Sequence, residues 1–246
     1  MYRIAIPSYK RPDGLKNKTI RTLLREGYTP DDIDIFVSNE EEKTMYSKVL
    51  PGYNLIVSNT MGLHNKKNFI TAYYPEGQHI LSMDDDITKM VYADISKYKT
   101  LKEVVPAIFR QMHNHNTILG GFFPAGDPRC MRNEWERGLC FILGAMYCYI
   151  NDKSIIIQQS SAEDAERTIK VYEKYKCVVR NGLYAPVTRY WENKGGITAS
   201  EEDRHSADYI AKKYFADTYP EYVKLVQKKD RYDLKYNIKL KVRYTD

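Results

Sequence analysis

The chain has 246 residues, 28% of them charged and 43% hydrophobic, which is typical of a globular protein rather than a disordered one. Its formal net charge of +6 permits a polyanionic partner without requiring one. The N-terminus lacks the apolar stretch of a signal peptide, and the longest apolar run, residues 139–150, is too short to span a bilayer. The four cysteines show no CxxC spacing, which favours a reduced protein without a zinc ribbon. We therefore expect no membrane partner and a cytoplasmic location, in the host cell if the chain is viral.

The first 90 residues alternate between predicted strands and predicted helices. Apolar runs bounded by turn residues predict strands, and apolar residues spaced by three and four predict helices. The strands are expected at residues 2–7, 32–39, 53–59 and 79–84. The helices are expected at residues 15–26, 40–50 and 64–74. This alternation indicates an α/β fold with a parallel, doubly wound sheet.

The remainder of the chain has a less regular pattern. Helices are expected at residues 101–116, 160–175 and 199–215. Strands are expected at residues 139–150, 154–159, within 177–187 and at 237–244, where apolar and basic residues alternate. Gly120 and Gly121 fall in a predicted loop. Since no linker or repeat interrupts the chain, we expect a single domain over residues 1–246.

Three consecutive aspartates, Asp84, Asp85 and Asp86, lie at the C-terminal end of the strand predicted at 79–84. Ligands of parallel sheets bind beyond the carboxyl ends of the strands, and polar clusters follow the other three strands as well. Neighbouring carboxylates repel one another, so a cation must offset their charge. Oxygen ligands suit Mg²⁺ or Mn²⁺, and a diphosphate sharing the ion would complete the site. The alternative is a solvated acidic turn or a helix start that attracts acids.

This combination resembles the GT-A glycosyltransferases. The segment IAIPSYKRP is similar to their opening strand and loop, and their aspartate motif follows a strand as ILSMDDD does. They often carry a glycine and then a basic–Asn pair, which Gly62 and Lys67-Asn68 match, with Lys where Arg is commoner. A later acidic pair opens a helix in these enzymes, and Glu163-Asp164 corresponds to it. The resemblance covers residues 1–90 well and residues 115–200 more loosely.

Within that fold the chain is most similar to the TET/JBP-associated glycosyltransferases of phages. The similar segments are IPSYKR, DDDI, the EDxERT helix start and a later R-Y-W…GG segment. That group is thought to glycosylate hydroxymethylated pyrimidines in DNA. The resemblance thus implies a metal-dependent transferase that uses Mn²⁺ or Mg²⁺ and a nucleotide-sugar, expected to be a UDP-sugar, with DNA as the acceptor.

The resemblance also implies how the chain is divided. We expect a GT-A (Rossmann-like) mixed sheet, mainly parallel in its N-terminal half and flanked by helices. Residues 1–90 would form the nucleotide-sugar-binding half, and residues 91–246 the acceptor-binding half with a basic C-terminal tail. The basic surfaces expected to meet DNA are the first helix (Lys16, Lys18, Arg21, Arg25) and the tail (Lys235, Lys239, Lys241, Arg243). The tail cations are explained equally well as guards of an edge strand.

Site residues follow from the same resemblance. Those expected to bind the nucleotide-sugar are Pro7, Ser8, Tyr9, Arg11, Asn39, Lys67, Asp84 and Asp85. Those expected to bind the metal are Asp86, Asp84 and His205. Those expected to meet the acceptor are Gly121, Arg189, Trp191, Gly195 and Gly196. Structural alternatives stay open, since Pro7 can simply end a strand, Asn39 can cap a helix, Lys67 and His205 can face water, and the glycines can serve turns.

Glu163 and Asp164 are the expected catalytic pair, with Asp164 as the base that takes the proton from the acceptor hydroxyl. Acids in a first helical turn also occur because they complement the helix dipole. If the reaction retains the sugar's configuration, the acid has another role.

Three other functions remain open from the sequence. The acceptor can be a protein, a glycan or a small molecule instead of DNA. A nucleotidyltransferase shares the Rossmann-like start and paired acids, but SYKRPDGLKNK has only one glycine and no phosphate loop. A non-catalytic DNA-binding module would not need intact aspartate and Glu-Asp motifs.

Overall fold

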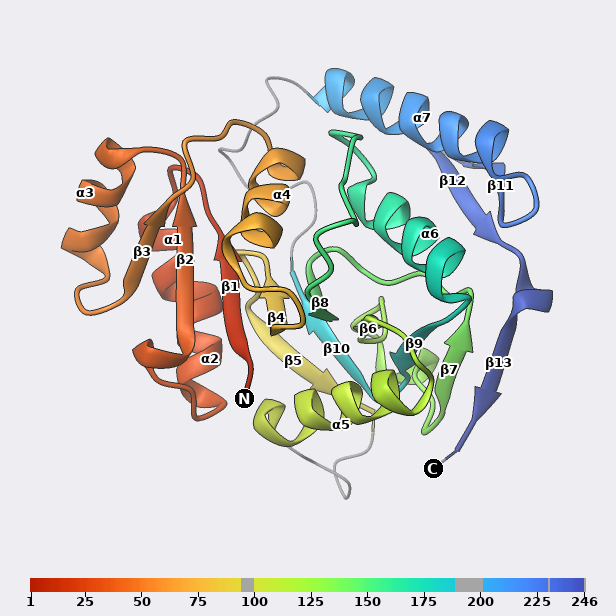
Figure 1. Cartoon of the computed structure of the whole chain (residues 1–246), viewed down its shortest axis with the longest axis horizontal. Helices are drawn as coiled ribbons and strands as arrows, with labels where there is room; N and C mark the ends of the chain where they lie inside the picture. The colour runs from red at the N-terminus through yellow and green to blue at the C-terminus, as the bar shows by residue number, and fades with distance from the viewer. Residues whose placement is uncertain (94–99, 189–200, 230, 246) are drawn as a thin grey trace.

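The computed structural model describes residues 1–93, 100–188, 201–229 and 231–245, with side chains omitted for 201–204. A nine-stranded sheet runs through the molecule with helices on both faces (Figure 1). Its strand order is β13-β7-β9-β6-β8-β4-β1-β2-β3. The predicted α/β class and mixed sheet are confirmed.

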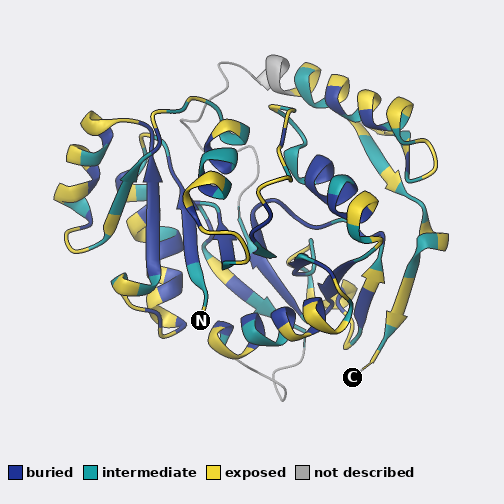
Figure 2. Cartoon of the chain, viewed as in Figure 1, coloured by how far each residue is buried: buried dark blue, intermediate teal, exposed yellow. Residues whose placement is uncertain are grey.

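The N-terminal strands form the parallel part of the sheet. They are β1 (Arg3–Pro7), β2 (Ile33–Val37), β3 (Asn54–Val57) and β4 (His79–Met83). β1 pairs in parallel with both β2 and β4, and β2 pairs in parallel with β3. β1, β2 and β4 are almost wholly buried (Figure 2), as expected for strands with helices on both sides. All four predicted strands are confirmed, and their carboxyl ends lie along one edge.

The second half of the chain extends the sheet with mostly antiparallel pairings. β8 (Met146–Ile150) lies antiparallel to β4, and β6 (Leu119–Gly121), β9 (Val178–Asn181), β7 (Trp135–Gly138) and β13 (Lys241–Tyr244) continue to the far edge. Two small sheets lie beside it. They pair β5 (Lys89–Tyr92) with β10 (Tyr184–Val187), and β11 (Val223–Lys228) with β12 (Arg231–Tyr236).

The helices fall on opposite faces of the sheet because strand side chains alternate. The first helical segment comprises α1 (Pro12–Leu15), the π-helical turn η1 (Lys16–Ile20) and α2 (Arg21–Arg25). It packs with α5 (Leu101–Asn114) in one core cluster, on Ile4, Ile35 and Leu81. α4 (Leu63–Tyr73) packs on Ala5 and Ile80, which point the other way. The remaining long helices are α3 (Glu40–Val49), α6 (Glu163–Tyr175) and α7 (Glu201–Thr218).

The sequence predictions are wrong at three strands and one loop. Of residues 237–244, only Lys241–Tyr244 forms a strand, because Ile238–Leu240 forms a 3₁₀ turn. Of residues 139–150, only Met146–Ile150 forms a strand. Residues 154–159 form no strand, because side chains satisfy this backbone: Ile157 bonds the amide of Asn68, and Gln158 bonds the carboxylate of Glu166. The predicted loop at Gly120 and Gly121 is strand β6.

Gly121 is explained by packing inside the sheet. A Cβ on this residue would lie 2.8 Å from Ile142 Cγ2. We therefore correct the expectation that Gly121 meets the acceptor: it is buried in β6, and the absence of a side chain serves the core.

The C-terminal strand uses its cations to join the sheet. Lys241 Nζ lies 2.7 Å from Glu136 of β7, and Arg243 Nε lies 3.1 Å from the same carboxylate. Arg180 of β9 also binds Glu136. Burial raises the pKa of Glu136, but Arg180 and Lys241 outweigh it and lower the pKa to about 2. These two tail cations therefore hold the edge strand in place.

We predict that Gly120→Ala destabilises the fold. The new Cβ would lie 2.5 Å from Ile108 Cγ2 and 2.8 Å from Met112 Sδ, so these side chains of α5 must move within the core. Such overpacking costs about 1–3 kcal/mol, measurable by urea unfolding. The control is Gly14→Ala in α1, where the new atom meets only Arg11 Cβ at 3.6 Å and stability should rise by about 0.5–1 kcal/mol. Equal stability of the Gly120 variant and the parent would contradict this account of β6.

Candidate functional site

The three aspartates differ in burial: one is buried and two are partly exposed. Asp85 is buried, accepts a hydrogen bond from Ser8 Oγ at 2.6 Å and pairs with Arg11 at 2.8 Å. Asp84 and Asp86 are only partly buried. Asp86 Oδ1 accepts a hydrogen bond from Thr188 at 2.7 Å. The expected nucleotide contact of Asp85 is therefore replaced by a link between the aspartate loop and the loop after β1.

The π-helical turn fixes the backbone of the aspartate loop. Thr19 Oγ1 donates to the carbonyl of Asp84 at 2.7 Å and accepts from the amide of Ile87 at 2.9 Å. Thr22 Oγ1 donates to the carbonyl of Ile87 at 3.2 Å. π-Helical turns are rare and often accompany functional sites. The sequence carried no signal for this role, because two threonines in a helix look like ordinary helical residues.

The loop after β1 rests on a buried polar network. Ser8 Oγ lies 2.6 Å from Tyr46 Oη, and Lys66 Nζ donates to the carbonyl of Ser8 at 2.7 Å and to Ser38 Oγ at 2.9 Å. Burial lowers the pKa of Lys66 to about 8. Lys66 Nζ also lies 5.7 Å from the centroid of the partly exposed Tyr9 ring. The sequence analysis chose Lys67 and missed Lys66 and Tyr46.

The expected nucleotide-site residues gather at the carboxyl ends of β1 and β2. Pro7 ends β1, and Ser8, Tyr9 and Arg11 follow it. Asn39 is the N-cap of α3, where its side chain accepts a hydrogen bond from the Glu42 amide at 2.8 Å. The cap role of Asn39, which was left open, is therefore observed.

The acid pair begins helix α6 and faces the loop before β8. Asp164 Oδ2 accepts from the amide of Gly144 at 3.2 Å, and its Oδ1 accepts from the amide of Ala165 at 2.8 Å. Glu163 Oε1 lies 2.5 Å from Lys67 Nζ of α4. Lys67 also donates to the carbonyl of Gly144 at 3.3 Å. Lys67 thus bridges the two halves of the chain rather than standing free for a diphosphate.

Gly144 is a site residue that the sequence analysis missed. A Cβ there would lie 2.9 Å from Asp164 Cβ and 2.9 Å from Glu163 Oε1. The glycine lets both carboxylates approach the backbone that binds them. Nothing in the local sequence indicates this, because the partners lie about twenty residues further along the chain.

Burial and like charges shift the titration of the site's acids. Burial, followed by the Glu163 charge, raises the pKa of Asp164 to about 6. Burial also raises the pKa of Asp84 to about 7, with Asp86 and Glu163 adding to the shift and Lys67 opposing it. Burial would raise the pKa of Glu163 too, but Lys67 and Arg167 hold it below its usual value. At Asp84 and Asp164, burial and neighbouring carboxylates therefore outweigh the charge of Lys67.

A divalent cation fits this donor set at Asp84 and Asp86. Their carboxylate oxygens are the ligands that Mg²⁺ and Mn²⁺ prefer, and the high pKa of Asp84 reflects charge that an ion would offset. Among the described residues, no group of three or more His, Cys, Asp or Glu side chains is arranged to hold a metal ion. His205 lies on α7 beside Tyr209 and Tyr232, so the expected three-residue metal site is not assembled. The remaining ligands would have to come from the substrate.

The other expected acceptor contacts cannot be compared with the structure. Arg189, Trp191, Gly195 and Gly196 lie outside the described residues.

None of the helices in the described part of the chain is both long and apolar enough to cross a membrane.

Comparison of the sequence with protein-family models and with curated proteins gives no match. Solved structures do match. A fragment of S. aureus TarS (residues 1–349) in complex with UDP-GlcNAc has a TM-score of 0.53 and 16% identity over 88% of this chain. Glucosyl-3-phosphoglycerate synthase from Mycobacterium tuberculosis, in complex with Mn²⁺, UDP-glucose and phosphoglyceric acid, has a TM-score of 0.52 and 10% identity over 88% of this chain.

This chain spans 66% of that TarS fragment, 40% of the longer TarS structure and 79% of the synthase. At these identities the likeness concerns the fold. The chain therefore has the GT-A fold, in agreement with the expectation from its sequence.

We predict that removing Lys67 destabilises the protein strongly. Lys67→Met leaves Glu163, whose side chain is 13% exposed, without its partner, and breaking such a buried pair costs about 3–5 kcal/mol. Urea unfolding measures the loss, and the double variant Lys67→Met/Glu163→Gln should recover part of it. The matched control is Lys213→Met, which breaks an exposed pair with Asp217 and should change stability little. Equal effects at the two sites would refute the bridging role.

Proposed function

We propose that the protein is a metal-dependent glycosyltransferase that moves a sugar from a nucleotide-sugar, in particular a UDP-sugar, to a hydroxyl acceptor. The single observation that carries the proposal is the acid cluster: Asp84, which follows β4 beside Asp86, experiences the charge of Glu163 at the start of α6. It lies in a GT-A fold, and two structural neighbours were solved with UDP-sugars, one of them with Mn²⁺. A cation-binding site beside a candidate base is what this reaction needs.

The donor would lie over the loop after β1. The Tyr9 ring is partly exposed beside Lys10 and Lys66, and is available to stack on a nucleotide base. Arg11 is 28% exposed and keeps a buried Nε that no described residue bonds. Its guanidinium group can therefore bind a phosphate while Nη2 stays paired with Asp85. Asp84 and Asp86 would hold Mn²⁺ or Mg²⁺, which stabilises the negative charge of the leaving diphosphate.

Asp164 would act as general base. Its two oxygens are oriented by the amides of Gly144 and Ala165, and its pKa of about 6 leaves it ionised at neutral pH yet basic enough to accept a proton. The acceptor hydroxyl would lose its proton to Asp164 while its oxygen attacks the anomeric carbon. The bond from that carbon to the diphosphate breaks as the new glycosidic bond forms. Glu163, paired with Lys67, positions the helix start.

For the acceptor we propose a hydroxymethylated pyrimidine in DNA, in an intracellular setting. The resemblance to phage enzymes suggests it, and unpaired cations support it. The side chains of Lys16, Arg21 and Arg25 form no hydrogen bond or ion pair with other described residues, and they line a hollow beside the apolar Leu24 and Tyr53. Glycan, protein and small-molecule acceptors are the alternatives. Assays of nucleoside diphosphate release with modified DNA, unmodified DNA and glycans distinguish them.

We predict that Asp86→Ala abolishes sugar transfer and leaves the fold intact. The variant removes one of two carboxylates that would hold the ion, while Asp85 still anchors the loop. Release of nucleoside diphosphate from several nucleotide-sugars with Mn²⁺ measures the activity. Thr188→Val, which removes only the hydrogen bond to Asp86, should lose much less. Full activity of Asp86→Ala in the presence of a chelator would rule out the metal role.

We predict that Asp164→Asn removes turnover but keeps nucleotide-sugar affinity, because the donor half is unchanged. In the parent protein the rate should rise with pH up to about 6 and then level off, since the base works only when deprotonated. Gly144→Ala should slow turnover as well, because its Cβ displaces both carboxylates. Isothermal titration with the nucleotide-sugar and a pH–rate profile test these points. Loss of donor binding with residual turnover in Asp164→Asn would instead assign this acid to the donor.

A further inference from the structure

A hollow of about 460 Å³ lies between helix α7 and the hairpin of β11 and β12, and we call it the hairpin hollow. Its size is in the range of ligand-binding sites. It is separate from the acid cluster, and the proposed donor site does not use it. Figure 1 shows the hairpin beside α7, at the upper right of the view.

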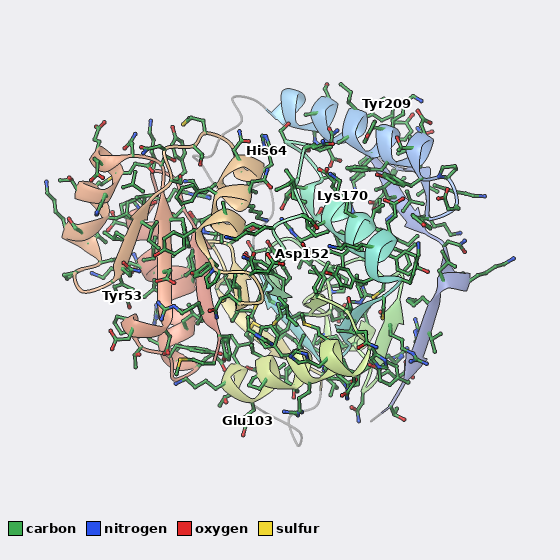
Figure 3. The ribbon with its side chains drawn as sticks, viewed as in Figure 1. Tyr53, His64, Glu103, Asp152, Lys170 and Tyr209 are labelled. Carbon is green, nitrogen blue, oxygen red and sulfur yellow. The ribbon has the colours of Figure 1, made fainter. Side chains whose placement is uncertain are left out.

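Two tyrosine rings form the aromatic part of the hairpin hollow. Tyr209 of α7 and Tyr232 of β12 have ring centroids 4.7 Å apart at an interplanar angle of 53°. Each residue is 37% exposed, although large aromatic rings are usually more deeply buried. Tyr209 projects near the edge of the molecule in Figure 3. The pair therefore offers ring surface to a ligand.

One lysine holds these rings in place. Lys212 Nζ lies 2.7 Å from Asp208 on its own helix and 3.7 Å from Asp233 on the hairpin. It also donates to the carbonyl of Tyr232 at 3.2 Å. The hairpin is thus fixed to the helix. Binding would then cost little reorganisation, because the rings are already oriented.

Cations line the same hollow at the tip of the hairpin. Lys228 pairs with Asp233 at 2.7 Å. Lys229 and Arg231 are exposed, and their side chains form no hydrogen bond or ion pair within the described part of the chain. The charge of Asp208, also in the lining, is neutralised by Lys212. The hollow therefore combines exposed aromatic surface with two positive charges that no described residue neutralises.

Helix α7, which lines the hairpin hollow, packs against the helix that carries the proposed catalytic base. Ala211 and Phe215 of α7 pack with Ala165 and Ile169 of α6 in one apolar cluster. α6 begins with the acid pair. The helix that carries Tyr209 therefore rests directly on the helix that carries the proposed base.

We propose that the hairpin hollow binds single-stranded nucleic acid, with a base stacked on the ring of Tyr232 against the edge formed by Tyr209, and the backbone phosphates held by Lys229 and Arg231. An unpaired base offers the rings a flat face, and its phosphates offer the cations a partner. A neutral glycan would leave the cations unused, and a duplex hides its base faces. The inference rests on the proposed DNA acceptor and adds where, and in which form, the DNA is held.

The test uses the full chain and a fluorescein-labelled oligothymidylate, with its duplex as comparison. Anisotropy should give tighter binding of the single strand, and Tyr232→Ala should weaken it about tenfold while Tyr232→Phe keeps it. The double variant Lys229→Gln/Arg231→Gln should reduce the salt dependence between about 50 and about 200 mM by roughly two phosphate contacts. The control is Lys48→Gln/Lys153→Gln, which removes the same charge from exposed residues elsewhere and should leave the slope unchanged.

Three results would overturn the inference: no binding of the oligonucleotide at low salt, equal affinity for the duplex, or full affinity in Tyr232→Ala. Full affinity in Tyr232→Ala would mean that the cations bind the oligonucleotide without any stacking on the ring. Titration of the parent protein with UDP-sugars and Mn²⁺ tests the transferase separately. Oligonucleotide binding without any nucleotide-sugar binding would refute the transferase and keep the hollow. Nucleotide-sugar binding without oligonucleotide binding would support the transferase and refute nucleic-acid binding at the hollow.

Discussion

The buried ion pair between Lys67 and Glu163 is the interaction on which the candidate site depends. It joins α4, which packs on the parallel half of the sheet, to α6, which covers the antiparallel half. Lys67 also bonds the carbonyl of Gly144 and lies 5.5 Å from the centroid of the Tyr147 ring. An ion pair with this little water around it is costly to separate, so it holds the start of α6 against the aspartate loop.

The same pair sets the electrostatics of the site. Lys67 neutralises Glu163, but Asp84 and Asp164 are each poorly solvated and each experience the charge of Glu163, and Asp84 also that of Asp86. Raised pKa values at Asp84 and Asp164 are the consequence. Such shifts are common at functional sites, where a carboxylate must bind a cation or move a proton. A structural acid in this protein behaves differently: Glu136, surrounded by Arg180, Lys241 and Arg243, has a lowered pKa.

Cations far from the site have two different uses. Lys241 and Arg243 are committed to Glu136 and fix the edge strand, so they are poor candidates for binding DNA. Lys229 and Arg231, at the tip of a hairpin, have no such partner in the described residues. The sequence shows only that the C-terminal region is basic. Only the structure shows which of these cations are paired with Glu136 and which lie at the hairpin tip without a partner among the described residues.

The sequence by itself determined the alternation of strands and helices, the aspartates at the end of a buried strand and the acids at a helix start, because these patterns are local. It missed β5, β6, β7, β11 and β12. It also placed a strand at 154–159, whose backbone instead bonds Asn68 and Glu166. Only the tertiary structure decided that Lys67 meets Glu163, 96 residues away, and that Gly144 lets the carboxylates approach. Such contacts depend on how elements pack, which no short stretch of sequence encodes.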